Sequence, residues 1–519
     1  MESMIMMGNE AVARGTIEAG CSVAAAYPGT PSTEILESLN RQSSEIKAQW
    51  SPNEKVALEV AFGAAVGGVR SLAVMKHVGL NVAADPLFTF SYTGVNGGLV
   101  IISADDPGQW SSQNEQDNRH YARHAKVPML EPSSPDEARE FITKAFDISE
   151  QFDRPVIVRV PTRLAHSRAV VRPVTPVTVE RKPFTRDPQK YVMIPAHGRK
   201  RHIAIEEKQK EVQQASDENG LNRIEWGDTK RGIITHSVPY QYVKEMLPDV
   251  SVLKIGMAWP LPDEMIREFA AKVDELIIVE ELDPFLENYI LAMGIDITHG
   301  KDLMPNCGEL TPDIVGSALA GENVEAQSSP QYTEPLPPRP PKLCKGCPHA
   351  PVFNALKELD LHVIGDIGCY TLAALAPYHA MHTQTCMGAS VSMHFGLEKA
   401  DDEMAQQSIA VIGDSTFIHS GITPLIDMVY NQGTGTVIIL DNRTTAMTGH
   451  QEHPGTGVTL KGEQTQTLDI EKLCKAVGVG RVTSVNPFKA DNLKQLIQTE
   501  VKAREPSVII TTHPCILNG

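Results

Sequence analysis

The most constraining feature of the sequence is a strand, helix and strand pattern in the last quarter of the chain. An apolar run at 408–412 leads into Asp414. Apolar residues at helical spacing follow over 419–431, and a second apolar run at 437–440 ends next to Asn442. Two such runs joined by a helix predict a parallel βαβ unit. A chain built around this unit is expected to have an α/β fold.

Asp414 and Asn442 end two strands that this pattern makes neighbours. The carboxyl ends of adjacent parallel strands lie side by side, so the two side chains can converge although 28 positions separate them. A carboxylate and an amide oxygen suit Mg²⁺, which takes its other ligands from phosphate oxygens. Gly413 and Ser415 would let the backbone approach such a phosphate. A Gly-Asp-Ser sequence alone also occurs in ordinary turns, so the prediction depends on the pair Asp414 and Asn442 and on their spacing.

Composition and charge narrow the class of protein. The chain has 519 residues, enough for more than two domains, with 41% hydrophobic and 21% charged residues. A net charge of -17 argues against nucleic acid as a partner. We find neither an apolar stretch long enough to span a membrane nor a basic export signal at the N-terminus. We therefore expect a cytoplasmic protein.

Strand-like and helical segments alternate along the rest of the chain, which is typical of doubly wound α/β domains. Prolines and charges are frequent after residue 170, and a second proline-rich stretch precedes the last domain. We predict domains at 1–170, 231–325 and 343–519, with a connecting segment at 171–230 and a linker at 326–342.

Four of the eight cysteines form a candidate ligand set in the last domain: Cys344, Cys347, Cys369 and Cys515. A CxxC pair alone is compatible with zinc, with a redox dithiol or with unligated thiols. The other four are expected to be ordinary core residues: Cys21, Cys307, Cys386 and Cys474.

Taken together, these motifs resemble the thiamine diphosphate enzymes. Asp-Ser, a helix, a strand and Asp-Asn resemble their metal-diphosphate motif, and the sequence TTAMTG at 444–449 resembles the 2-oxoacid:ferredoxin oxidoreductases. Three stretches resemble one branch, the indolepyruvate ferredoxin oxidoreductase alpha subunits: 72–131, 344–396 and 408–457. The resemblance implies a pyrimidine-type and a diphosphate-type thiamine diphosphate-binding domain, both doubly wound, flanking a transketolase C-terminal-like α/β domain.

The resemblance also assigns cofactor residues. Asp414, Asn442 and the Thr444 carbonyl would bind Mg²⁺. Glu54, nine residues before Gly63, would promote the imino tautomer of the cofactor and so its activation. Glu59 is the rival for this role, and Glu54 could instead merely favour its helix N-terminus. The remaining residues expected at the cofactor are Gly388, Ala389, Ser390, Gly413, Ser415 and Met447.

Other residues are expected at the substrate. The turn at 27–32 resembles the one that presents a Thr to the oxoacid carboxylate, a role that falls on Thr30. Arg119 and Arg123 are candidates for a bidentate grip on that carboxylate, or else surface salt-bridge residues. Met447 stands where the pyruvate enzymes have an Asn, which favours a larger, apolar substrate side chain.

In the related pyruvate enzymes, cysteines in this order hold an iron-sulfur cluster beside the cofactor. The resemblance thus implies one four-iron cluster, with zinc as the alternative, on Cys344, Cys347, Cys369 and Cys515. The implied reaction is oxidative decarboxylation of arylpyruvates to aryl-acetyl-CoA and CO₂, with coenzyme A as co-substrate. A non-oxidative decarboxylase and a catalytically silent subunit are the rival interpretations.

Partners are implied as well. The family pairs this subunit with a gamma- or beta-type chain and passes electrons to ferredoxin, and a homodimer within a heteromer is expected. Alpha subunits usually continue into a ferredoxin-like domain, whereas this sequence stops four residues after Cys515. We therefore expect electrons to leave through a partner or another acceptor.

Overall fold

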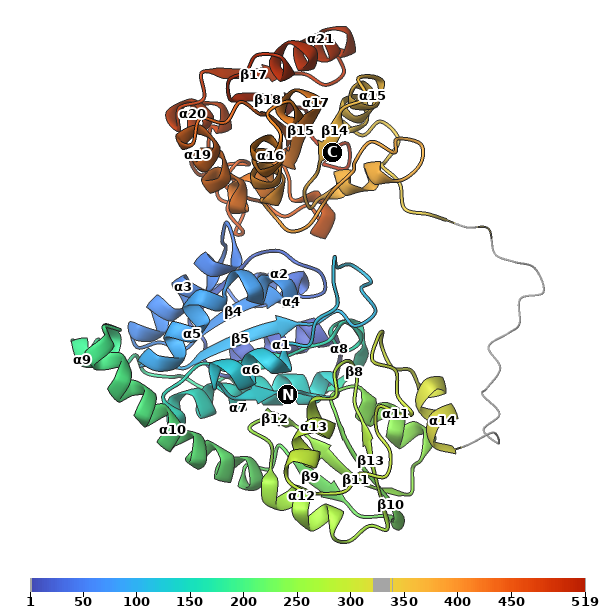
Figure 1. Ribbon diagram of the computed structural model, residues 1–519. Coiled ribbons are helices and arrows are strands. Elements are labelled where there is room, and N and C mark those ends of the chain that lie inside the picture. Colours follow the sequence, from blue (N-terminus) through green and yellow to red (C-terminus); the bar gives the residue numbers. More distant parts are fainter. Residues whose placement is uncertain (1, 321–336, 338, 519) are drawn as a thin grey trace. The chain divides into compact units, whose positions relative to one another are not determined.

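The structure is a computed structural model that describes residues 2–320, 337 and 339–518. It contains two compact units, Met1–Gln331 and Tyr332–Gly519, here called unit 1 and unit 2 (Figure 1). Most of the predicted linker, 326–336 and 338, lies outside the described residues.

Unit 1 is built around a seven-stranded sheet with the order β12-β6-β7-β5-β4-β2-β3. Its pairs are parallel except that β12 runs antiparallel to β6. Every residue of β5 is buried, as expected for a strand covered by helices on both faces. The strands are β2 (Val23–Ala26), β3 (Lys47–Trp50), β4 (Ser71–Lys76), β5 (Leu99–Ala104), β6 (Met129–Leu130), β7 (Val156–Arg159) and β12 (Met257–Trp259).

Helices cover this sheet. One core cluster joins apolar residues of α3, α5 and α6 to those of β4 and β5, while α1 packs against α2 and α7. Asn53 caps α3 by accepting from the backbone N–H of Val56. The helices are α1 (Gly8–Glu18), α2 (Thr33–Gln42), α3 (Glu54–Val66), α4 (His77–Val82), α5 (Ala84–Thr93), α6 (Arg119–Ala125), α7 (Pro135–Phe152) and α8 (Thr162–His166); β1 (Met4–Met7) pairs with β8 (Arg168–Val171).

A second sheet in unit 1 has the order β13-β10-β11-β9. The long helix α10 (Pro195–Glu218), preceded by the short α9 (Pro188–Tyr191), leads into it (Figure 1). Its strands are β9 (Arg223–Glu225), β10 (Asp228–His236), β11 (Val250–Ile255) and β13 (Glu275–Val279), and its helices are α11 (Pro239–Met246), α12 (Asp263–Ala270), α13 (Phe285–Ala292) and α14 (Pro312–Ala320). The three residues of β12, which follow β11, leave this sheet and pair with β6 of the first one. The two sheets are thereby joined.

Unit 2 holds a five-stranded parallel sheet with the order β14-β15-β16-β18-β17. The predicted βαβ unit is β15, α19 and β16, with β15 and β16 paired in parallel. The strands are β14 (His362–Ile364), β15 (Ser408–Gly413), β16 (Thr436–Asp441), β17 (Arg481–Val485) and β18 (Ser507–Thr512), and the helices are α15 (Ala350–Glu358), α16 (Ala389–Ala400), α17 (Met404–Gln407), α19 (Ile422–Tyr430), α20 (Ile470–Ala476) and α21 (Ala490–Val501).

The helix of this βαβ unit begins earlier than the predicted position 419. Helical structure starts at Asp414, with α18 (Asp414–Thr416), a π-helical turn at Phe417–Gly421, and then α19. The carboxylate of Asp414 stands in the first helical turn, where the backbone N–H groups favour a negative charge. A π-turn widens a helix locally and is frequent at functional sites.

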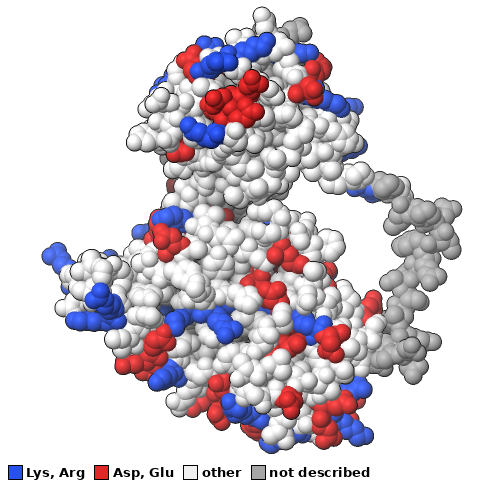
Figure 2. Space-filling view, viewed as in Figure 1, with Lys and Arg blue, Asp and Glu red and all other residues white. Residues whose placement is uncertain are grey.

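Two surface properties accompany this fold. Within the described part of the chain, no helix combines the length and the apolar composition that crossing a membrane requires. Figure 2 shows Lys and Arg side chains scattered among Asp and Glu on the face in view, with no single basic patch there.

Candidate active site

The carboxyl ends of the unit 2 strands bring the predicted metal residues together. Asp414 follows β15 and Asn442 follows β16, and the two strands are neighbours. Asp414 is 2% exposed, Asn442 is 7% exposed and Thr444 is 4% exposed. Such burial of a carboxylate is costly unless hydrogen bonds or a cation compensate it.

Backbone N–H groups hold the Asp414 carboxylate in place. Its Oδ1 accepts from the N–H of Ser415 (2.8 Å) and its Oδ2 from the N–H of Arg443 (2.9 Å). Asn442 Oδ1 accepts from the N–H of Thr444 (3.3 Å). These bonds fix the loop after β16 against the start of α18, so oxygen atoms from both strands face one edge of the sheet.

A second carboxylate, that of Asp441, lies at the same strand end. Burial and the negative charge of Asp414 raise the pKa of Asp441 to about 6, although Arg443 Nε lies 3.1 Å away. Negative charge is thus concentrated at this edge. This donor set of buried oxygens fits a divalent cation such as Mg²⁺, and a cation there would favour the ionised form of both carboxylates.

His453 is a buried histidine that the sequence did not single out. Its Nδ1 accepts from the N–H of Gly455 (3.1 Å), so in the neutral ring Nε2 carries the proton. Nε2 lies 3.3 Å from Asp414 Oδ2 but is not aligned for a hydrogen bond to any described group. A buried donor beside the metal residues suits an anionic group such as a phosphate.

Three residues that the resemblance places at the cofactor, Gly388, Ala389 and Ser390, lie at the N-terminal end of α16. The N–H groups of Gly388 and Ser390 both donate to the carboxylate of Asp366 at 2.9 Å, and Ala389 lies between them. The backbone N–H groups of two of these three residues therefore have a partner within the protein, because a buried carboxylate caps the helix. Burial raises the pKa of this carboxyl group. The last predicted cofactor residue, Met447, is 51% exposed within unit 2.

The four predicted cluster cysteines lie within electrostatic range of one another. Burial and the negative charges of Cys347, Cys515 and Cys344 raise the pKa of Cys369 to about 11. Among the described residues, however, no three of these sulfur atoms lie within 4.8 Å of one another. Tetrahedral zinc, with Zn–S bonds of about 2.3 Å, holds its sulfur ligands about 3.8 Å apart. The four sulfur atoms are therefore not arranged for a single tetrahedral zinc ion.

Hydrogen bonds connect these cysteines to the metal residues. The N–H of Cys515 donates to the carbonyl of Asn442 (2.9 Å). Tyr370, which follows Cys369, accepts through its hydroxyl from the N–H of Gly413 (2.9 Å) and donates to Ile367 (3.0 Å). The cysteine group and the candidate Mg²⁺ site are therefore neighbours within unit 2.

The remaining cysteines divide into two pairs. Cys21 and Cys474 are buried, as predicted, but the prediction of core positions for Cys307 and Cys386 is wrong, because both are exposed. Both cysteines lie outside the helices and strands, in segments that lead directly into a glycine. Apolar residues beside them in the sequence are therefore not enough to predict that they are buried.

In unit 1, Glu54 is the first residue of α3 and is 5% exposed. Its carboxyl group packs against Gly79, where a Cβ atom would lie 2.6 Å from Glu54 Oε1. The rival Glu59 is half-exposed and pairs with Lys55 on the same helix. Of the two carboxylates, Glu54 is therefore the one held inside the fold at the end of the sheet.

Thr30 lies in the turn after β2 and is half-buried. Hydrogen bonds order this turn: the N–H of Gly29 donates to Thr33 Oγ1 (3.0 Å), and Ser32 Oγ donates to the carbonyl of Gly29 (2.8 Å). The turn places Thr30 at the carboxyl edge of the first sheet, the edge at which ligands bind in such folds.

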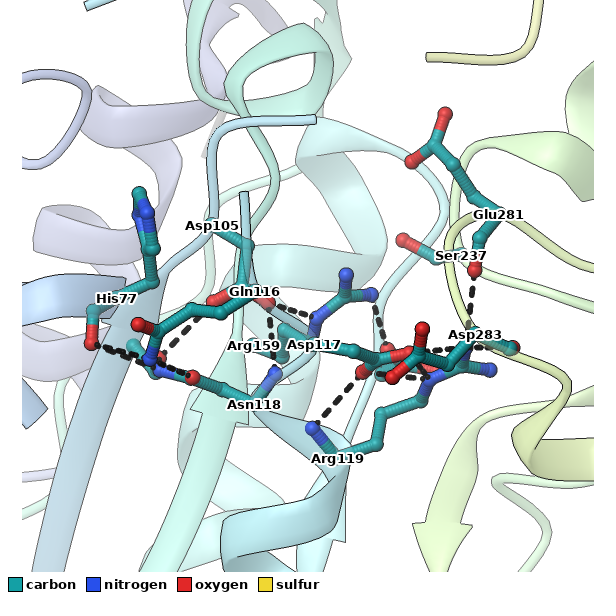
Figure 3. A network of polar contacts seen from close by, with 12 residues as sticks. His77, Asp105, Gln116, Asp117, Asn118, Arg119, Arg159, Ser237, Glu281 and Asp283 are labelled. Atoms are coloured by element: carbon teal, nitrogen blue, oxygen red, sulfur yellow. Dashed lines mark hydrogen bonds and ion pairs between the residues drawn. The ribbon is translucent and has the colours of Figure 1, made fainter. Parts of the chain in front are cut away.

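Arg119 does not occupy the position predicted for it. It is fully buried in a polar network between the two sheets of unit 1 (Figure 3). Its Nε donates to Asp117 (2.9 Å), Nη1 to Glu280 (2.7 Å), and Nη2 to Asp117 and to the carbonyls of Glu281 (2.9 Å) and Asp283 (3.0 Å). These bonds, with His236 Nε2 at 3.3 Å from Nη1, occupy its five N–H groups. We assign Arg119 a structural role in place of the predicted substrate grip.

The same network contains a second buried arginine. Arg159 Nε contacts Asp105 (2.5 Å) and its Nη1 contacts Glu131 (2.6 Å), whose other oxygen lies 2.6 Å from His236 Nδ1. Arg123, the other predicted substrate residue, is exposed, and its guanidinium lies 5.7 Å from the ring centre of Trp259 in β12.

Comparison with known proteins agrees with this fold. The family described as "Thiamine pyrophosphate enzyme, C-terminal TPP binding domain" matches residues 366–511, and "Pyruvate flavodoxin/ferredoxin oxidoreductase, thiamine diP-bdg" matches residues 14–226. The predicted fold class is thereby confirmed: the chain is an α/β protein of the thiamine diphosphate enzymes, with both types of binding domain.

Close relatives narrow the class to one family. Indolepyruvate oxidoreductase subunit IorA of Archaeoglobus fulgidus is 41% identical, with 99% of this chain and 87% of the relative covered. The same subunit of Methanothermobacter marburgensis is 41% identical (100% and 87%), and that of Thermococcus kodakarensis is 39% identical (99% and 86%). The chain belongs to the indolepyruvate oxidoreductase subunit IorA family. The predicted resemblance and enzyme class are confirmed, and these relatives give no support to the non-oxidative decarboxylase.

A solved structure shares the fold. The 2-oxoglutarate:ferredoxin oxidoreductase from Magnetococcus marinus, solved with 2-oxoglutarate, coenzyme A and succinyl-CoA bound, aligns with a TM-score of 0.52 at 19% identity. The alignment covers 61% of this chain and 65% of that one.

Proposed function

We propose that this chain is the catalytic subunit of a cytoplasmic oxidoreductase that converts an arylpyruvate and coenzyme A into aryl-acetyl-CoA and CO₂. Two electrons and one proton are released and leave through an iron-sulfur cluster. The observation that supports this best is the placement of Asp414, Asn442 and Thr444 beside four cysteines in unit 2.

Asp414, Asn442 and the Thr444 carbonyl would hold Mg²⁺, and the Nε2–H of His453 would face a phosphate oxygen. Glu54, buried at the start of α3, would hydrogen-bond the aminopyrimidine ring of the cofactor and hold a proton on its ring nitrogen, which promotes the imino tautomer. Thiamine diphosphate supplies the carbanion-stabilising chemistry that loss of CO₂ from a 2-oxoacid requires. Thr30 would donate to the substrate carboxylate, and Met447 would contact its aromatic side chain.

Cys344, Cys347, Cys369 and Cys515 would ligate one four-iron cluster. The sulfur spacing favours this over a single zinc ion, and the reaction needs an acceptor that takes electrons one at a time. The backbone hydrogen bond from Cys515 to Asn442 supports a short path from the substrate to such a cluster. A gamma- or beta-type partner subunit and ferredoxin or another carrier would then receive the electrons.

The first test is iron and acid-labile sulfide per chain in protein purified without oxygen. We expect about four of each, with visible absorbance that dithionite bleaches, and a thioester product that forms only with coenzyme A. Zinc in place of iron, or an aldehyde product formed without coenzyme A, would contradict the proposal. Failure to bind thiamine diphosphate with Mg²⁺ would instead favour the catalytically silent subunit.

A further inference from the structure

Lys76 is the last residue of β4, close to two of the predicted site residues of unit 1, Thr30 and Glu54. β4 pairs directly with β2, which ends in the turn that carries Thr30, and β2 pairs with β3, which leads into the helix of Glu54. The carboxyl ends of three adjacent strands therefore gather Lys76, Thr30 and Glu54 at one edge of the sheet.

The turn after β2 leaves room for the Lys76 side chain. A Cβ atom on Gly29 would lie 3.1 Å from both Cγ and Cδ of Lys76, so the methylene stem packs directly against the backbone beside Thr30. Nζ donates to the carbonyl of Ser111 at 2.8 Å. An ammonium group has three N–H donors, and this hydrogen bond engages one of them.

The charges around Lys76 come from three elements. Asp106, after β5, and Glu54, on α3, both favour the ammonium form, and His77 follows on α4. Burial nevertheless outweighs both carboxylates and lowers the pKa of Lys76 to about 8. A further anion at Nζ would compensate this desolvation. Asp106 does not fully compensate the buried charge of Lys76, because its carboxylate already accepts hydrogen bonds from three other residues: Ser111, Ser112 and Thr162.

We propose that Lys76 is the cation that binds the carboxylate of the 2-oxoacid substrate, a specificity role that rests on the proposed function. Neither predicted arginine can take it. Arg119 has its five N–H groups engaged, and Arg123 lies against β12, which is separated from β4 by three strands. Neighbouring strands lie about 4.8 Å apart, so the four spacings from β12 to β4 amount to ~19 Å.

The test uses the holoenzyme with Lys76→Gln, which keeps a donor for the Ser111 carbonyl and removes the charge. We expect kcat/KM for the arylpyruvate to fall by roughly 10- to 100-fold through KM, as for loss of a charge-assisted hydrogen bond. Lys76→Arg should restore most of the loss. Lys47→Gln, an exposed lysine at the amino end of β3, is the matched control and should change nothing.

A binding measurement separates this inference from turnover. By calorimetry, the wild type should bind 3-phenylpropanoate more tightly than the neutral 3-phenylpropanamide, and Lys76→Gln should lose this preference. The wild-type preference should also decline above about pH 8, since the uncharged amine no longer attracts a carboxylate, whereas in Lys76→Arg it should persist.

An unchanged KM and an unchanged carboxylate preference in Lys76→Gln, with a wild-type thermal unfolding profile, would overturn the assignment. A wild-type holoenzyme that binds the carboxylate through Lys76 but forms no thioester would instead contradict the proposed function.

Discussion

At the scale of single residues, Asp414 is fixed more firmly than any other predicted ligand. Two backbone N–H groups hold its oxygens, and a second carboxylate at Asp441 adds negative charge nearby. The position is therefore arranged before any ligand arrives, which reduces the reorganisation that binding requires.

Asp414→Asn should weaken binding of Mg²⁺ and thiamine diphosphate by about 100-fold or more, because a metal-ligand charge contributes several kcal/mol. Calorimetric titration would measure this. Asp427→Asn is the control, since Asp427 is exposed on α19 of the same unit. Equal affinity in the two variants would exclude Asp414 as a ligand.

Glu54→Gln should lower kcat by roughly 10²- to 10⁴-fold, as for loss of a general acid-base group, and leave the visible absorbance of the cluster intact. Glu59→Gln should be nearly silent because Glu59 lies half-exposed on the same helix. The opposite ranking of these two variants would transfer the activating role to Glu59.

Cys369→Ser and Cys515→Ser should each lose most of the bound iron, because a hydroxyl replaces a thiolate ligand. Cys386→Ser, at an exposed cysteine of the same unit, should retain it. Iron analysis beside thermal unfolding would show whether the loss is specific to the ligand set.

At the scale of elements, the contact between the two sheets of unit 1 is polar, although most sheet faces are apolar. Glu281, after β13, is 4% exposed and accepts from the N–H of Leu310 (2.8 Å). Burial raises its pKa from an ordinary 4.5 to about 7. The folded state therefore binds more protons than the unfolded chain between these values, and the free energy of unfolding falls as pH rises through them.

Glu281→Gln should remove this pH dependence, since the amide oxygen still accepts from Leu310. At pH 8 the free energy of unfolding of the variant should exceed that of the wild type by about 3 kcal/mol, and at pH 4 the two should differ little. Denaturant unfolding at both pH values measures it. Glu280→Gln should instead lower the free energy of unfolding at both pH values, because Glu280 is an ion-pair partner of the buried Arg119.

The pattern of buried strands was sufficient to predict the βαβ unit and the neighbouring ends of Asp414 and Asn442. Local patterns could not predict β12, because three residues carry no periodicity, nor the burial of Arg119, whose partners come from a sequence-distant sheet. His453 and Lys76 were missed for a similar reason. Their surroundings come from strand neighbours and a glycine turn, not from the residues beside them in the sequence.

At the scale of the whole molecule, the chain divides into two units with separate cores. We expect calorimetry to show more than one unfolding transition. Mg²⁺ with thiamine diphosphate at 100 times its dissociation constant should stabilise the unit that binds it by about 2.7 kcal/mol. Asp414→Asn should abolish the shift, and a shift that persists in this variant would place the diphosphate elsewhere.

The strand β12 limits how such a protein can be divided among genes. Because residues 257–259 pair with β6 of the first sheet while the strands before and after them build the second, a separately encoded second sheet would take β12 with it and expose β6 as the edge strand of the first sheet. The two sheets of unit 1 therefore belong together in one polypeptide. A gene fission or fusion in this lineage would preserve both sheets together and fall between the two units.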